Sequence, residues 1–113
     1  PLEIYESAQQ GKLQTVVKWL RKGGPVDAIC SASTSDGETS TFGLLHAAAT
    51  NGQLDLVREL LKRGASVDLP NNHGFTALMT AAHLGHLDIL NLLLQHSANP
   101  DLQCNYGSTA LIQ

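Results

Sequence analysis

The sequence predicts an all-α fold, an α-solenoid in which short antiparallel helix pairs stack in a row. The first observation behind this prediction is an internal repeat: residues 45–69 and 78–102, at an offset of 33, are identical at eleven of 25 positions. The second is the spacing of apolar residues, which follows helical periodicity within each repeat. One such helix pair cannot bury its own apolar face, whereas stacked pairs can, so the repeats favour a linear array.

The best-defined elements are two helices in residues 41–68. A helix rich in small residues is expected over 44–51, ending at Gly52, where a residue with positive φ is favoured. The alanines of this helix would let a neighbouring helix approach closely. The apolar face of the second helix is expected to consist of Leu54, Val57, Leu60 and Leu61. The unit at 74–101 repeats this order after a turn segment rich in Pro, Asn and Gly.

The N-terminal segment joins the pattern as an incomplete first unit at about 1–28. Residues 7–13 correspond to residues 48–54 at an offset of 41, which places an eight-residue insertion between the first and second units. Trp19 lies at an apolar position of this unit's second helix. We expect it to fill the core rather than to bind a partner.

The repeat also has a recognisable motif. Residues 74–86 read GFTALMTAAHLGH, and residues 60–65 read LLKRGA. These segments, from the third and the second unit, resemble the ankyrin repeat, whose consensus has Gly-x-Thr-Pro-Leu-His-x-Ala-Ala-x-x-Gly-His before an apolar helix that ends in Leu-Leu-x-x-Gly-Ala. The resemblance implies an ankyrin-repeat α-solenoid, one domain over 1–113, with β-hairpin-like turns between its helix pairs. The implied repeats are at about 1–28, 41–68 and 74–101, with a partial repeat at 107–113.

Individual positions of the family pattern carry further expectations. Gly43 stands where the family has a Thr that caps the first helix, and losing such a cap typically costs about 1 kcal/mol. His46 occupies the family's histidine position, which implies that its imidazole bonds the backbone of the adjacent hairpin. An array that stopped at Gln113 would expose Leu87, Leu90 and Leu94, so we expect the chain to continue beyond it with a capping unit.

The insertion is the most individual part of the sequence. Residues 31–41 contain seven Ser or Thr together with Asp36 and Glu38, and they lengthen the hairpin expected before the second repeat. One interpretation is a surface loop, tolerated because extra loop residues cost little. A second is a local helix start, since Ser35 and Glu38 have capping-box spacing. A third is a loop that contacts a partner or is phosphorylated.

Composition and motif content argue against catalysis, nucleic-acid binding and membrane insertion. The net charge is −3, the seven Lys and Arg are scattered, and aromatic residues make up 4%, too few for base stacking. No apolar run approaches the ~20 residues that span a bilayer, and neither a secretory signal nor a phosphate-binding loop is present. We therefore expect no enzyme and no cofactor, and an intracellular protein, cytoplasmic or nuclear.

The spacing of cysteines and histidines does not favour a metal site. Cys30 and Cys104 are far apart in sequence, and we expect two free thiols rather than a disulfide. His73, His83 and His86 could form a surface cluster, but a helix end is expected between the last two. Structural histidines and no metal are the expectation.

The resemblance places partner binding on the hairpin tips and the concave surface of the inner helices. The residues that map to this surface are Phe42, Thr50, Asn51, Asn72, His73, Phe75, His83, Leu84, Asn105 and Tyr106. They include both Phe residues and one of the two Tyr, and rigid aromatic side chains are typical binding anchors. The implied function is a non-catalytic scaffold or adaptor for a protein partner. The alternatives are a regulatory or targeting segment of a larger enzyme and a structural subunit of a large multi-protein assembly.

Overall fold

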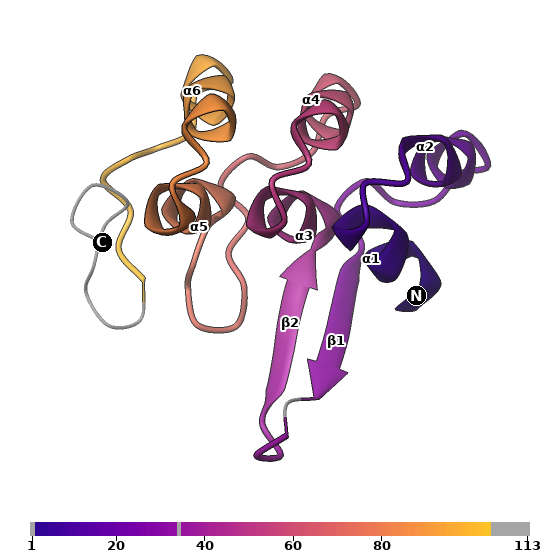
Figure 1. The fold of residues 1–113 in the computed structure, drawn as a ribbon, viewed down its shortest axis with the longest axis horizontal. Helices are drawn as coiled ribbons and strands as arrows, with labels where there is room; N and C mark the ends of the chain where they lie inside the picture. The colour runs from indigo at the N-terminus through magenta and orange to yellow at the C-terminus, as the bar shows by residue number, and fades with distance from the viewer. Residues whose placement is uncertain (1, 34, 105–113) are drawn as a thin grey trace.

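The helices lie in two rows, as the repeat predicts. The computed structural model describes residues 2–33 and 35–104. In chain order their elements are α1 (Leu2–Gln9), α2 (Leu13–Arg21), β1 (Ile29–Ser33), β2 (Thr39–Gly43), α3 (Leu44–Thr50), α4 (Leu54–Lys62), α5 (Ala77–Leu84) and α6 (Leu87–Gln95). The inner row is α1, α3 and α5, and the outer row is α2, α4 and α6 (Figure 1). The predicted α-solenoid is confirmed.

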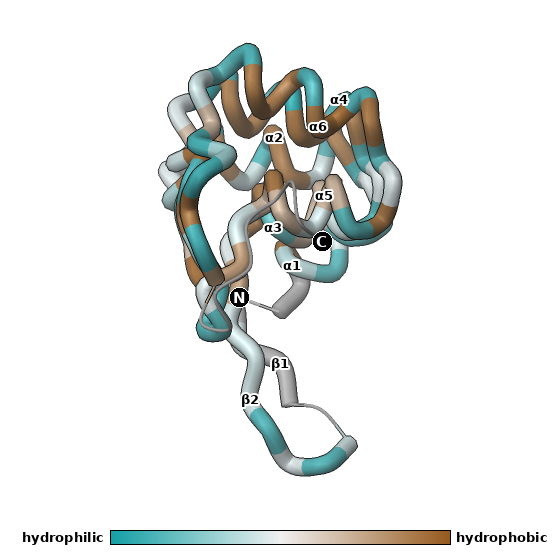
Figure 2. Tube along the Cα trace, turned by 90° about the vertical axis from the view of Figure 1, so that its left-hand side faces the viewer, coloured by the Kyte–Doolittle hydropathy of each residue, from teal (hydrophilic) through white to brown (hydrophobic). Residues whose placement is uncertain are grey.

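Small residues let the inner row pack closely. Ala48 and Ala49 of α3 are completely buried, and so are Ala8 of α1 and Ala81 of α5. Because each of these side chains is a single methyl group, neighbouring helices approach without leaving voids. The outer row closes the core from above, with its apolar residues on the side that faces the inner row and its polar residues on the opposite edge (Figure 2). Trp19 of α2 is half-buried and packs against this core.

The buried face of α4 is shifted from the predicted one. Leu56, Val57, Leu60 and Leu61 are buried, whereas Leu54 is only half-buried. The prediction named Leu54 in place of Leu56. Positions i, i+1, i+4 and i+5 form one stripe on a helix, and this stripe faces the inner row, whereas Leu54 is the first residue of the helix and lies at its edge.

Replacing Ser97 by glycine should raise the free energy of unfolding by up to about 1 kcal/mol. Ser97 follows α6 with φ 68°, and the matching residue of the preceding repeat is Gly64 with φ 90°. A side chain is strained in this left-handed region, whereas glycine is not. Urea denaturation measures the gain, and Gly64→Ser is the matched variant with the opposite expected sign. A loss of stability in Ser97→Gly would contradict this explanation.

The insertion forms an antiparallel two-stranded sheet. β1 pairs with β2 along its whole length, with Ser31 opposite Thr41. The expected long hairpin is therefore present, but most of it is strand rather than loop. Ser35 and Glu38 lie in the turn between the strands and no helix starts there, so the interpretation as a local helix start is wrong. Figure 1 shows the hairpin projecting away from both rows of helices.

The base of the hairpin is fixed by stacked rings. The ring of Phe42 lies between those of Tyr5 and His46, with centroid distances of 5.2 and 5.7 Å. The next residue, Gly43, is the N-cap of α3 and supplies no side-chain cap, as predicted, whereas Thr76 caps α5 by accepting a main-chain hydrogen bond. Glycine at an N-cap costs only a few tenths of a kcal/mol, less than the loss expected from the sequence.

Candidate functional site

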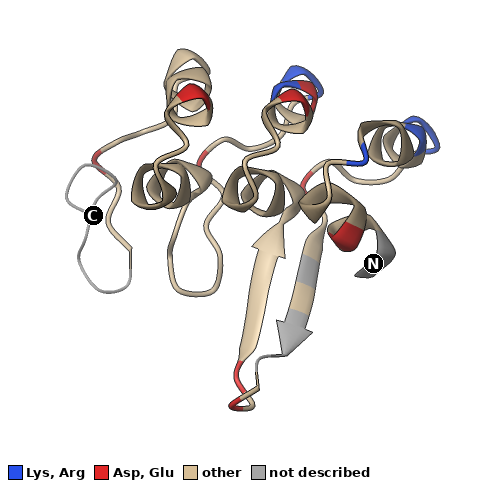
Figure 3. Ribbon diagram, in the orientation of Figure 1, with Lys and Arg blue, Asp and Glu red and all other residues tan. Residues whose placement is uncertain are grey.

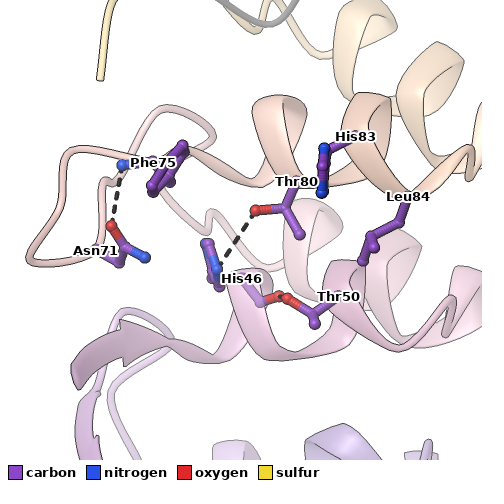
Figure 4. A pocket seen from close by; sticks show the side chains of 7 residues that line it. All are labelled: His46, Thr50, Asn71, Phe75, Thr80, His83 and Leu84. Carbon is purple, nitrogen blue, oxygen red and sulfur yellow. Dashed lines mark hydrogen bonds between the residues drawn. The ribbon is translucent and has the colours of Figure 1, made fainter. Parts of the chain in front are cut away.

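A groove lies between the inner helices α3 and α5, on the side from which the hairpins project. Its volume is about 310 Å³. The residues that line it are His46, Thr50, Asn71, Phe75, Thr80, His83 and Leu84 (Figure 4). Two come from α3, three from α5 and two from the loop that precedes α5. The stacking of two repeats therefore creates the groove, and neither repeat could form it alone.

His46 is the most buried of the groove residues, with 8% of its surface exposed. Its Nε2 lies 3.4 Å from Thr80 Oγ1, so one hydrogen bond joins α3 to α5. Its Nδ1 is buried and has no hydrogen-bond partner among the described residues. The implied bond from this imidazole to the adjacent hairpin is thus replaced by a bond to the next repeat. Burial lowers the pKa of His46 to about 4, so the side chain is neutral at physiological pH.

The loop wall of the groove is held in place by Asn71. Its Oδ1 accepts hydrogen bonds from the main-chain N–H of His73 and of Phe75, both at 2.9 Å, and its own N–H donates to the carbonyl of Phe75 at 2.8 Å. Local bonds of this kind are the reason that Asn favours turns. They fix the main chain at Phe75, whose half-buried ring lines the groove.

The opposite end of the groove combines an apolar and a polar side chain. Leu84, the last residue of α5, is 46% exposed. Thr50 Oγ1 donates to the carbonyl of His46 at 2.8 Å, so this hydroxyl is satisfied by its own helix. His83 is exposed and lies beside them (Figure 4). The open surface of the groove is therefore largely apolar.

The charged side chains lie away from this groove. No Asp, Glu, Lys or Arg is among its lining residues. Figure 3 shows the Lys and Arg of the described chain mainly on α2 and α4, in the outer row. The ion pairs there, Arg58 with Asp55 at 3.2 Å and Arg63 with Glu59 at 2.8 Å, lie along α4. The first of these pairs is exposed and contributes little to stability, whereas the second is half-buried.

Four of the predicted binding residues meet in the groove: Thr50, Phe75, His83 and Leu84. The others lie elsewhere. Asn51 Nδ2 caps its own helix by donating to the carbonyl of Ala47 at 3.1 Å. Phe42 lies at the base of the hairpin and not at its tip, and Asn72 hydrogen-bonds to β2. His73 is half-buried in the turn beside Asn72, while Asn105, Tyr106 and the partial repeat predicted at 107–113 lie outside the described residues.

The sequence prediction missed three lining residues. His46 was assigned a structural role only, and Asn71 and Thr80 were not considered. A signal existed for Thr80, because the repeat offset of 33 aligns it with Ala47 and a larger polar residue thus replaces a small one. For Asn71 the signal was weaker, since Asn in a turn is expected for local reasons alone.

The histidines and cysteines of the described chain have structural roles or stand alone. The described residues contain no group of three or more His, Cys, Asp or Glu side chains arranged to hold a metal ion. None of the helices described is long and apolar enough to cross a membrane. His86 packs over Gly52 and its Nε2 lies 3.3 Å from the carbonyl of Thr50, which is a structural role. Cys104 is a free, buried thiol, and the side chain of Cys30 is outside the described part.

Stacked helix pairs with projecting hairpins define an α-solenoid repeat protein. The family profile for ankyrin repeats (3 copies) matches residues 4–104, so the chain belongs to the ankyrin-repeat family. No curated protein matches the chain. Ankyrin repeats are generally protein–protein interaction modules and are typically non-catalytic.

Proposed function

We propose that the chain is a non-catalytic interaction module, a scaffold or adaptor, and that it binds an uncharged, partly apolar segment of a protein partner in the α3–α5 groove. The observation that carries this proposal is the groove itself, about 310 Å³ and without a carboxylate, Lys or Arg in its lining. Phe75 and Leu84 supply apolar surface, while Thr50 Oγ1 and Asn71 Oδ1 are bonded within the chain. Contact with these two apolar side chains would supply much of the affinity for such a segment.

The tips of the hairpins extend this surface. Residues 70–76 and the β1–β2 hairpin project on the same side of the inner row (Figure 1), and Asn71 and Phe75 of the first segment line the groove. A partner that is longer than the groove would contact His73 and residues 35–38 at these tips. A regulatory or targeting segment of a larger enzyme would use the same surface.

A structural role in a larger assembly is the second candidate, and one observation favours it. Leu87 is 64% exposed and Leu94 is 40% exposed, both on α6, the last helix among the described residues. Exposed apolar side chains grouped on one element are typical of a surface that another protein covers. Gel filtration of the native particle distinguishes a stable assembly from a transiently bound adaptor.

Replacing Leu84 by glutamine should weaken partner binding by about tenfold. A leucine that becomes buried on binding contributes about 1.5 kcal/mol or more, which corresponds to roughly this factor. The partner is first captured by the wild-type chain and identified, and its Kd is then measured by calorimetry. Leu87→Gln is the matched control, because Leu87 is also exposed but lies outside the groove. Equal affinities of the two variants would exclude the groove as the binding site.

A further inference from the structure

The two edges of the β1–β2 hairpin differ in how they are covered. The outer edge of β2 is bonded to Asn72, whose N–H donates to the Thr41 carbonyl at 3.3 Å. The Asn72 side chain completes the contact: Oδ1 accepts from the Thr41 N–H at 3.1 Å, and Nδ2 donates to the Thr39 carbonyl at 2.9 Å. Asn72 therefore takes the place of a short third strand beside β2.

These bonds determine which main-chain groups of β1 point outward. In an antiparallel pair, opposite residues alternate between hydrogen-bonded and non-hydrogen-bonded positions. Both the N–H and the carbonyl of Thr41 are hydrogen-bonded to Asn72 and not to β1. The Ser31–Thr41 pair is therefore a non-hydrogen-bonded pair. The N–H and carbonyl of Ser31 consequently point away from β2. By the same alternation, those of Ile29 point to the same side.

The outer edge of β1 has no strand paired with it among the described residues, although helix α1 contacts β1. Among the described residues nothing bonds the outward main-chain groups of Ile29 and Ser31. Ile29 is 50% exposed and Ser31 is exposed. Edge strands are normally protected by charged residues or proline, and the sequence of β1, ICSAS, contains neither. An extended chain can therefore approach this edge without meeting a charge or a missing donor.

We propose that this edge is a second binding surface, which takes an extended segment of a partner protein as an added strand. Main-chain hydrogen bonds to Ser31 would supply the affinity, as in other cases of strand addition. The turn of the hairpin carries Asp36 and Glu38, both exposed, and residues 29–43 contain no Lys or Arg. The partner segment that fits this edge is therefore uncharged where it pairs with β1, and it carries basic residues at the end that reaches the acidic turn.

The charges favour such a peptide over a second copy of this chain. Antiparallel pairing of two β1 strands would bring the acidic turn of each copy toward α1 of the other. Helix α1, LEIYESAQ, contains Glu6 and no basic residue, so like charges would face each other. A peptide with basic residues at one end removes this repulsion and replaces it with attraction.

The test uses a pair of variants at Ser31 and one synthetic probe. Ser31→Pro removes the outward N–H and leaves the bonds to β2 intact, because the Ser31 N–H is not part of that ladder. Ser31→Ala keeps the N–H and removes only the hydroxyl. The probe is a fluorescent decapeptide of alternating Thr and Val with two Lys at one end, and fluorescence anisotropy gives its Kd for the full chain. A second decapeptide with two Glu at that end tests the charge.

We expect the wild type and Ser31→Ala to bind the Lys peptide equally and Ser31→Pro to bind it about tenfold more weakly. The Glu peptide should bind more weakly than the Lys peptide. The proposal is overturned if the wild type does not bind the Lys peptide or if the two Ser31 variants bind it equally. A wild-type dimer in sedimentation that Ser31→Pro abolishes would also overturn it, since the occupant would then be a second copy.

Amide exchange of the wild type provides a readout that does not depend on the folding of Ser31→Pro. Binding of the Lys peptide should slow exchange at the Ser31 amide and leave the Thr41 amide, which already bonds Asn72, unchanged. If peptide binding slowed exchange at neither the Ser31 nor the Thr41 amide, the peptide would not bind at the β1 edge. Leu84→Gln should bind the Lys peptide as the wild type does, because Leu84 lines the groove and not the hairpin. The proposal for the β1 edge and the proposal for the groove can therefore be refuted independently of each other.

Discussion

Lowering the pH from 6.5 to about 4 should destabilise the folded chain by up to about 3 kcal/mol through His46 alone. Burial lowers the pKa of His46 to about 4 from an ordinary value of 6.5. Between these two values the unfolded chain binds a proton at this imidazole and the folded chain does not, so acid favours unfolding. Above pH 6.5 the imidazole is neutral in both the folded and the unfolded chain. Protonation of His46 therefore no longer changes the free energy of unfolding.

The variant His46→Met isolates this effect. Met79 fills the matching position of the next repeat and is buried there, so the fold accommodates methionine at this site. Urea denaturation at pH 7, 6, 5 and 4 gives the free energy of unfolding of both proteins. All other side chains are the same in the two proteins, so the difference between the curves reports His46. Parallel curves over this range would contradict the explanation.

Much of the fold could be predicted because the repeat ties one position to another. An offset of 33 makes residues 45–51 and 78–84 equivalent, and both segments are inner-row helices that lie side by side. The same offset relates Gly52 to Gly85, and the two have φ values of 69° and 75°. In a solenoid each repeat contacts mainly its neighbours, so a local pattern that recurs predicts a geometry that recurs.

The hairpin had no such support, because eight of its residues are an insertion without a counterpart in the other repeats. Its Ser and Thr residues suit a strand as well as a loop, and the choice was decided by contacts distant in sequence. Phe42 stacks on Tyr5, and Asn72 bonds the edge of β2. Both partners are brought to the hairpin by the stacking of helices, which no local pattern in the sequence describes.

The groove could be predicted only in part, because it combines equivalent positions of the repeats with contacts between non-equivalent ones. Mapping onto the inner helices identified Thr50 and His83, which are equivalent under the repeat. The bond between His46 and Thr80 joins two repeats through non-equivalent positions, so comparing the repeats with each other could not reveal it. Sequence repetition predicts where the helices lie, whereas the contacts between repeats depend on residues that differ from one repeat to the next.

Replacing Leu60 by alanine should lower the free energy of unfolding by about 3 kcal/mol. Leu60 is completely buried on α4, and this helix contacts both α2 and α6. Truncation removes apolar contacts and leaves a cavity in the middle repeat of the array. Urea denaturation measures the loss. Leu87→Ala is the matched control, because Leu87 is 64% exposed and its truncation should change stability by no more than about 0.5 kcal/mol.

The same variant should also separate the unfolding of the first repeat from that of the third. In a linear array the middle repeat is the connection through which the end repeats stabilise each other, so a weakened middle repeat lowers cooperativity. Trp19, the single tryptophan, lies in the first repeat and reports it by fluorescence, while circular dichroism reports all the helices. The two probes should give one transition for the wild type and displaced transitions for Leu60→Ala. Coincident transitions in the variant would mean that the repeats unfold as one unit.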